Sequence, residues 1–320
     1  MALSYKLLFV IIAITTSLPQ VCPAQCSDAR VCSLHGNENG IFRRSGVCAE
    51  YLNGYSGHDY DIRYESLKLG GYYWTSREFN INCVLPLNRQ RSGNVAIQGI
   101  GDVLIAADYL INDHPGDLTF SGDNSLIQGR FEATSLQLGV KLATGSTNVL
   151  HLPLRYQSGL GTNDILLGIL YAAANPQKYD YDLFQGGFSL QIPLGKVAQD
   201  SFSLQRSIDL LGRIDYNYPI LQKFGLKAGA LVIAHLTKAT RSETFIYTTE
   251  TSPDPISTEV TSTINENTFQ CNITAGATYT YQGDISLETG FILPLLKRKY
   301  NYDGLKREYT LFVSANYHFN

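Results

Sequence analysis

The sequence has 320 residues, with 25 Lys or Arg against 28 Asp or Glu, a formal net charge of −3. A nucleic-acid-binding protein normally clusters its basic residues on one face, and the densest basic group here is only Lys297, Arg298 and Lys299. The 28 Gly, 21 Tyr and 14 Phe are more typical of sheet than of helix. We therefore predict an all-β protein with no nucleic-acid partner.

Residues 1–24 have the layout of a secretory signal peptide. Lys6 precedes an uncharged, mostly apolar run that ends at Leu18, and small residues follow up to Ala24. The run is too short to span a bilayer, so we expect cleavage after Ala24 and export from the cytoplasm.

Residues 25–58 are predicted to form an N-terminal periplasmic segment, either a plug or a pinned tail, with or without the first strand. The segment is rich in turn residues, and it holds Cys26, Cys32 and Cys48. Cys26 and Cys32 are close enough to form a local disulfide in an oxidising compartment, with Cys48 as a competing partner. The cysteine spacing fits no common metal framework, and we expect no metal and no cofactor.

Residues 59–320 are predicted to form the barrel, because long segments alternate with a period of two. In 269–282, for example, Phe269, Cys271 and Ile273 alternate with Gln270 and Asn272. A helix would scramble this pattern. Eleven such segments are expected, at 62–74, 77–87, 95–112, 130–143, 161–174, 182–194, 203–219, 224–241, 266–281, 283–296 and 305–319.

The length of these strands, and their aromatic ends, indicate a transmembrane antiparallel β-barrel. After the first 24 residues no stretch holds the roughly 18 apolar residues of a membrane helix, so strands must carry any membrane role. Bacterial barrels have even strand numbers, so we expect 12 strands, the twelfth around 46–58. Cys83 and Cys271 fall on apolar faces and should point unpaired at lipid. The expected location is the outer membrane of a Gram-negative bacterium.

The loop lengths predict the orientation of the barrel. If the C-terminus is periplasmic, the long segments 144–160 and 242–265 are extracellular, as is usual for such barrels. The segment 242–265 is expected to be either a solvated loop or an extension of its hairpin above the membrane. The connection 113–129 is the exception, since it is long yet falls on the periplasmic side, so either it is a real periplasmic excursion or the strand count there is wrong. We also expect the C-terminal strand, which ends at Phe319, to contact the barrel assembly machinery.

Three glycine-containing runs carry a family resemblance. They are GIGDVLIAADY at 99–109, LGVKLATG at 138–145 and SGLGTNDILLGILYA at 158–172. In order and spacing they resemble the outer-membrane transporter family named for the phenol meta-cleavage degradation pathway. The matching positions are Gly99, Gly101, Asp102, Gly139, Lys141, Thr144, Gly145, Gly159, Gly161 and Asp164, whereas Ala143 stands where the family usually has Pro.

This resemblance implies passive uptake of a small apolar or aromatic solute. The segment around Cys26 and Cys32 also looks like the start of related barrels from Bacteroidetes. Neither likeness identifies a cargo, and the alternative is a structural or adhesive barrel without transport.

Charged residues on predicted inward faces are the candidate site. A charge near the midplane of a lipid-facing strand costs about 2 to 4 kcal/mol, so these side chains should face the interior. They would either pair with one another and fill a narrow lumen, or form a polar constriction. Leu166 and Leu170 lie on a strand that is apolar on both faces, and they should either line part of the interior for an apolar solute or pack against the N-terminal segment. The lumen-lining candidates are Asp108, Lys141, Leu166, Leu170, Asp209, Arg213, Asp215, Lys227, His235 and Glu288.

An enzyme is not expected. The pairs Gly99–Gly101 and Gly159–Gly161 open onto no helix and precede no Lys-Ser or Lys-Thr pair, so they are read as strand-end glycines and not as phosphate loops. His235 and His318 lie in convincing strands, but spacing alone places no Ser or Asp beside either. We therefore predict no catalytic residues.

Overall fold

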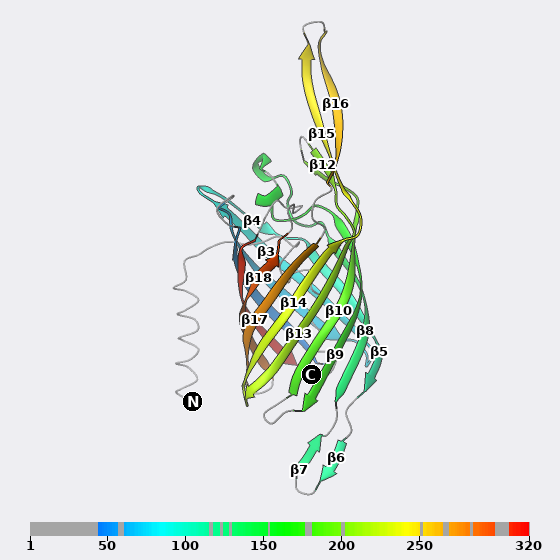
Figure 1. Cartoon of the computed structure of the whole chain (residues 1–320), viewed down its shortest axis with the longest axis vertical. Helices are drawn as coiled ribbons and strands as arrows, with labels where there is room; N and C mark the ends of the chain where they lie inside the picture. The colour runs from blue at the N-terminus through cyan, green and yellow to red at the C-terminus, as the bar shows by residue number, and fades with distance from the viewer. Residues whose placement is uncertain are drawn as a thin grey trace.

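The structure is a computed structural model, and it describes residues 44–56, 61–114, 118–121, 124–127, 130–152, 154–176, 181–199, 202–249, 252–264, 269–281, 284–297 and 307–319. The predicted signal peptide and the disulfide candidates Cys26 and Cys32 lie outside these residues. Figure 1 shows one barrel, with a long hairpin at one end and a short one at the other.

Twelve strand positions close the barrel, which confirms the predicted fold class and strand number. Neighbouring strands are antiparallel, and the first pairs with the last, Ser45 opposite Phe319. The barrel strands are β1 (Ser45–Tyr55), β2 (Arg63–Trp74), β3 (Phe79–Ser92), β5 (Val103–His114), β8 (Phe131–Leu142), β9 (Asn163–Pro176), β10 (Tyr181–Leu194), β13 (Asp209–Leu221), β14 (Phe224–His235), β17 (Phe269–Tyr281), β18 (Ile285–Leu296) and β19 (Tyr309–Phe319).

One predicted strand, 95–112, is interrupted. β4 (Val95–Ile100) pairs with the last residues of β3, whereas β5 pairs with its first residues. Gly101 and Asp102 lie between β4 and β5, where the backbone leaves the ladder and the Asp102 carboxylate enters the barrel. β4 and β5 thus share one position in the barrel.

Two other predicted strands, 203–219 and 224–241, each divide at the end of the barrel where the long hairpin stands. There β11 (Val197–Gln199), β12 (Phe202–Gln205), β15 (Ala239–Thr249) and β16 (Ser252–Ile264) form a separate four-stranded sheet. The predicted segment 242–265 is therefore an extension of its hairpin. We call this end of the barrel the mouth.

The opposite end, the turn end, carries the hairpin of β6 (Leu118–Ser121) and β7 (Asn124–Ile127) (Figure 1). It lies within the connection 113–129. This connection therefore projects from the end opposite the long hairpin, which is the side on which the sequence predicts it. The loop at the mouth between β8 and β9 holds two single-turn 3-10 helices, η1 (Val149–His151) and η2 (Leu154–Tyr156).

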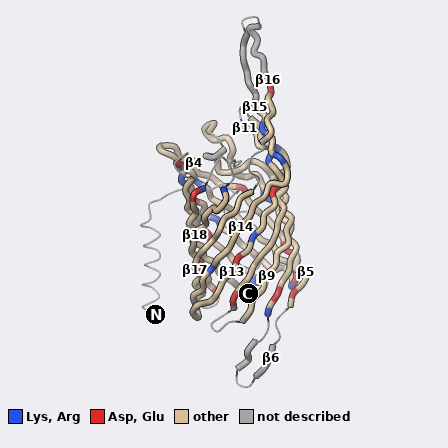
Figure 2. Tube along the Cα trace, in the orientation of Figure 1, with Lys and Arg blue, Asp and Glu red and all other residues tan. Residues whose placement is uncertain are grey.

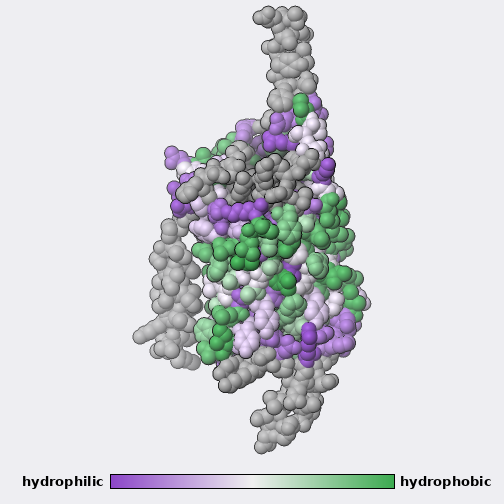
Figure 3. All heavy atoms as spheres, in the orientation of Figure 1, coloured by the Kyte–Doolittle hydropathy of each residue, from purple (hydrophilic) through white to green (hydrophobic). Residues whose placement is uncertain are grey.

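The outer surface separates by polarity along the barrel axis. Hydrophobic side chains form a band over the barrel strands, and hydrophilic ones gather towards both ends (Figure 3). Aromatic rings are exposed near the turn end, as expected for a membrane-interface girdle. These rings include Tyr73, Tyr109, Tyr216, Tyr218, Tyr317 and Phe319. No helix among the described residues is long and apolar enough to span a membrane.

Candidate functional site

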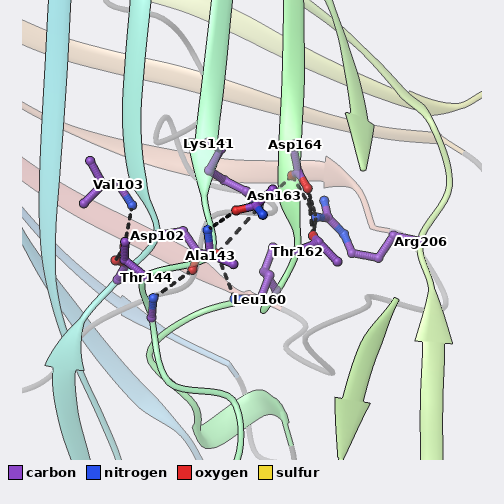
Figure 4. A network of polar contacts seen from close by, with 12 residues as sticks. Asp102, Val103, Lys141, Ala143, Thr144, Leu160, Thr162, Asn163, Asp164 and Arg206 are labelled. Atoms are coloured by element: carbon purple, nitrogen blue, oxygen red, sulfur yellow. Dashed lines mark hydrogen bonds and ion pairs between the residues drawn. The ribbon is translucent and has the colours of Figure 1, made fainter. Parts of the chain in front are cut away.

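The three glycine-containing runs meet inside the mouth. Asp102 precedes β5, Lys141 lies near the end of β8, and Asp164 lies at the start of β9. The Lys141 Nζ is 2.7 Å from an Asp164 carboxylate oxygen and 3.6 Å from one of Asp102. Figure 4 shows these side chains converging from adjacent strands. All three are almost completely buried, so their charges neutralise one another away from bulk water.

Asp164 is the centre of this network. Arg206, which lies between β12 and β13, places Nη1 2.8 Å from the Asp164 Oδ2, and the Thr162 hydroxyl donates to Oδ1 at 2.7 Å. The Gln191 amide on β10 donates to the same carboxylate. The Asp164 carboxylate therefore contacts side chains from β8, from β10 and from the segments that lead into β9 and β13. We call Asp102, Lys141, Asp164 and Arg206 the charged wall.

The charged wall also holds the loop 143–162. Asp102 accepts hydrogen bonds from the backbone N–H of Gly145 at 3.1 Å and of Leu160 at 2.9 Å. The two ends of the loop approach so closely that a Cβ on Gly145 would lie 2.4 Å from the Cα of Gly159. Glycine is required at such a backbone crossing, which gives these positions of the motif a physical role.

Two inward side chains of β3 hold the same loop. The Asn88 amide donates to the backbone carbonyl of Ser158 at 2.7 Å, and the Gln90 amide donates to that of Gln157, also at 2.7 Å. Gln157 in turn bonds the backbone of Val149 and Leu152, closing the loop on itself. The loop is therefore a fixed part of the mouth.

Apolar side chains cover the other side of the mouth. They project inward from β1, β13, β14, β18 and β19 and are nearly inaccessible to water, and Leu154 and Leu160 of the loop belong to the same buried cluster. Because inward positions of a water-filled lumen are usually polar, this apolar surface is a departure from a general porin. We call these strand residues the apolar wall: Leu52, Leu211, Leu231, Ile233, Ile292 and Phe312.

Each charged lumen candidate lies on the buried face of its strand and has polar contacts there. Figure 2 shows blue and red positions distributed along the barrel strands. The Lys227 Nζ is 3.2 Å from the Glu288 carboxylate, Arg213 pairs with Asp215, and Asp209 pairs with His235. Asp108 accepts hydrogen bonds from three amides. Whether any of these residues contacts a solute stays a prediction.

The two leucine candidates lie on the same face of β9 as Asp164. Leu166 is buried with Val84, Leu104 and Ala106, and Leu170 is half-buried. Their neighbours Leu167 and Ile169 are exposed on the outer face. The apolar character of both faces of this strand thus has two separate causes, lipid outside and a packed interior inside.

The structure brings His235 together with Ser207 and Asp209, which spacing alone did not indicate. However, the Ser207 hydroxyl and the Asp209 carboxylate both contact the same ring atom, Nδ1. In a hydrolase triad the serine bonds one ring nitrogen and the carboxylate orients the ring through the other. Ser207 is also fully buried. The arrangement therefore does not have the geometry of a nucleophile and its base.

Sequence reasoning missed several residues of the mouth. Asp102 and Asp164 appear in the motif but not among the lumen candidates, and Arg206, Gln191 and Asn88 appear in neither. The described ranges contain no group of three His, Cys, Asp or Glu side chains placed to hold a metal ion. Cys83 and Cys271 face outward, and Cys48 faces inward. No disulfide joins any two of these three.

A closed barrel with an apolar outer band, an aromatic girdle near its turn end and a loop fixed in its mouth defines an outer-membrane β-barrel of Gram-negative bacteria. Comparison with solved structures agrees. An outer membrane channel from Pseudomonas putida F1 matches over 86% of this chain and 96% of its own, at 13% identity and a TM-score of 0.50.

Two further similar structures are the Pseudomonas putida toluene transporter TodX and an autotransporter domain. TodX matches over 93% of this chain and 95% of its own, at 8% identity and a TM-score of 0.41. The translocator domain of NalP from Neisseria meningitidis matches over 90% and 100%, at 11% identity and a TM-score of 0.40. No family model and no curated protein matches the sequence. The match to the Pseudomonas putida F1 channel therefore supports the fold alone, and the family resemblance stays a prediction.

Proposed function

We propose that the protein is an outer-membrane channel for passive uptake of small hydrophobic or aromatic molecules, of the transporter family that its glycine-containing runs resemble. The apolar wall is the observation that carries this proposal. Six bulky apolar side chains face the interior at the mouth, packed with Leu154 and Leu160 of the loop, and an entering apolar solute would replace these two leucines there. An apolar molecule gains free energy from such a surface, about 25 cal/mol for each Å² removed from water, and a sugar or an ion does not.

The charged wall supports a restricted path. Its charges neutralise one another, so it supplies no field that would select anions or cations in general. It also holds the loop 143–162 across the mouth. Twelve strands give a lumen between that of a filled eight-stranded barrel and that of an open sixteen-stranded porin. Size and surface chemistry would therefore act together on what passes.

The proposal is tested by comparing solutes in a host whose own outer membrane excludes them. Cells that express the protein should take up a radiolabelled small aromatic faster than cells that lack it. Phe312→Asn, which makes the apolar wall polar, should reduce this uptake, whereas Phe312→Leu should retain most of it. Entry of sugars can be measured by liposome swelling. Rapid, unselective entry of sugars would overturn the proposal.

A structural or adhesive barrel is the second candidate. The sheet of β11, β12, β15 and β16 stands beyond the mouth, where a partner could contact it (Figure 1). Ion pairs such as Lys68–Glu50, at 2.8 Å and buried, would then only fill the interior. The absence of both conductance in planar bilayers and uptake of any solute would favour this candidate.

A further inference from the structure

A row of polar side chains crosses three neighbouring strands below the mouth. Asn80 on β3, Asp108 on β5 and Gln137 on β8 are opposite one another in the strand register, and all three face the interior. Asp108 follows Asp102 by six residues, roughly 20 Å along an extended strand. The row is therefore separate from the charged wall and deeper in the barrel.

Neutral groups alone hold the Asp108 carboxylate. The amides of Asn80 and Asn82 each donate to Oδ2 at 3.1 Å, and the Gln137 amide donates to Oδ1. Other inward carboxylates pair with cations, for example Glu50 with Lys68 and Glu288 with Lys227. Within the described residues no basic side chain lies within 4.0 Å of Asp108. A buried charge ordinarily requires such a partner, so a cation beside Asp108 would be stabilising.

The same row also has an excess of hydrogen-bond acceptors. Because both amides turn their nitrogen atoms to Asp108, the Asn80 Oδ1 and the Gln137 Oε1 are left buried without a hydrogen-bond donor. Asn80 and Gln137 are more than nine-tenths buried. A buried acceptor without a donor costs about 1 to 3 kcal/mol, so a bound donor would be favourable. The row thus offers one carboxylate and two free amide oxygens.

Apolar and small residues lie directly above the row on the same strands. Val84 pairs with Leu104, and Ala106 lies opposite Gly139, where a Cβ would come within 3.1 Å of the Ala106 Cβ. Leu166 completes this buried group. A molecule with an apolar body beside this buried group and a hydrogen-bond donor beside Asp108 would match both.

We propose that this row, Asn80, Asp108 and Gln137, binds the ammonium group of a small amphipathic amine. A primary ammonium supplies a positive charge and three N–H donors, which match the carboxylate and the two amide oxygens. This inference rests on the proposed function, because the apolar body of the amine is the part of the molecule that the channel would select. Binding itself, however, is measurable without transport.

The test is calorimetric titration of the full chain in detergent micelles with benzylammonium chloride. Asp108→Asn should bind it about 10- to 100-fold more weakly, as expected for loss of a charged hydrogen-bond partner. Glu50→Gln, which removes an inward carboxylate that has its own lysine, should bind as the unmodified protein does. Equal binding to the unmodified protein and to Asp108→Asn would overturn the proposal.

Two probes test the unmodified protein directly, in case Asp108→Asn does not fold. Benzyl alcohol has the same ring without a charge, and benzyltrimethylammonium has the charge without an N–H donor. Both should bind at least about tenfold more weakly than benzylammonium, since each loses part of the match. Binding of potassium ions that displaces benzylammonium at equal concentration would assign the row to inorganic cations and overturn the proposal. Failure of aromatic uptake in cells with intact benzylammonium binding would instead reject only the proposed transport.

Discussion

The two sides of the mouth hold the same loop by different physical means. On the charged wall, Asp102 accepts the Leu160 backbone N–H, and on the apolar wall the Leu160 side chain is fully buried among aliphatic and aromatic groups. Hydrogen bonds to a carboxylate specify direction, whereas apolar burial is proportional to area and tolerates changes of shape. The charged wall should therefore determine where the loop lies, and the apolar wall should supply most of the stabilisation.

The largest effect is expected at the centre of the charged wall. Asp164→Leu removes the carboxylate that Lys141 and Arg206 share, and loss of one member of a buried ion pair costs about 3 to 5 kcal/mol. The free energy of unfolding can be measured in urea through the fluorescence of Trp74, the single tryptophan.

A triple variant sharpens this test. Lys141→Met, Asp164→Leu and Arg206→Met together replace the charges by apolar groups, and such replacements are often neutral or stabilising. We expect it to recover most of the lost stability while the loop becomes less ordered. An unchanged urea midpoint for Asp164→Leu alone would show that the charged wall contributes little.

The next effect is expected on the apolar wall. Leu160→Ala should lower the free energy of unfolding by about 2 to 5 kcal/mol, because a buried leucine is truncated and leaves a cavity. Leu150→Ala in the same loop is the matched control, since that side chain is 70% exposed. Equal losses of stability for the two variants in the same urea experiment would contradict the role assigned to burial on the apolar wall.

A smaller effect is expected at the β3 contact. Asn88→Ala removes the donor to the Ser158 carbonyl and the acceptor for the Ser66 hydroxyl, at a cost of about 1 to 3 kcal/mol. Limited proteolysis at the loop should become faster. Asn88→Asp retains an acceptor for Ser66 and loses the donor, so protection of the loop by this variant would show that the Ser158 contact is unimportant.

The smallest effect is expected outside both walls. Lys297 and Glu308 form an ion pair whose side chains are 39% and 46% exposed. Exposed pairs contribute about 0 to 1 kcal/mol, so Lys297→Ala should leave the urea midpoint nearly unchanged. A loss of stability as large as that of Asp164→Leu would show that burial is not what makes ion pairs of the charged wall more important than this exposed pair.

Strand positions were predictable because lipid outside and a filled interior impose a period of two over whole segments. The same physics explains the errors in strand bounds. Residues 202–205 and 239–249 continue as strands beyond the barrel, where β12 pairs with β15, so their pattern does not stop at the membrane boundary. The break at Gly101 and Asp102 was not visible, because it depends on a carboxylate turning inward to a loop 58 positions away.

The residues of the mouth were only partly predictable for a related reason. Lys141 stands out as a charge within an alternating strand, and Asp102 and Asp164 stand out only through the motif. Arg206 lies between two strands, where alternation assigns no face, and its contact with Asp164 depends on the pairing of β10 with both β9 and β13. Asn88 and Gln90 are ordinary polar residues by pattern, and only the folded loop gives them their roles.

The pairing of β1 with β19 constrains how the chain acquires its structure. Ser45 and Phe319 are partners across 319 − 45 = 274 positions, whereas β13 and β14 are joined by a turn of a few residues. Closing a flexible segment of that length costs about 5 kcal/mol of chain entropy, far more than a hairpin. Closure must therefore wait until the C-terminal strand has been synthesised and exported. A chain shortened by that strand would lose only the pair of β18 with β19 among its hairpins, yet β1 and β18 would become open edges, which hydrocarbon does not tolerate.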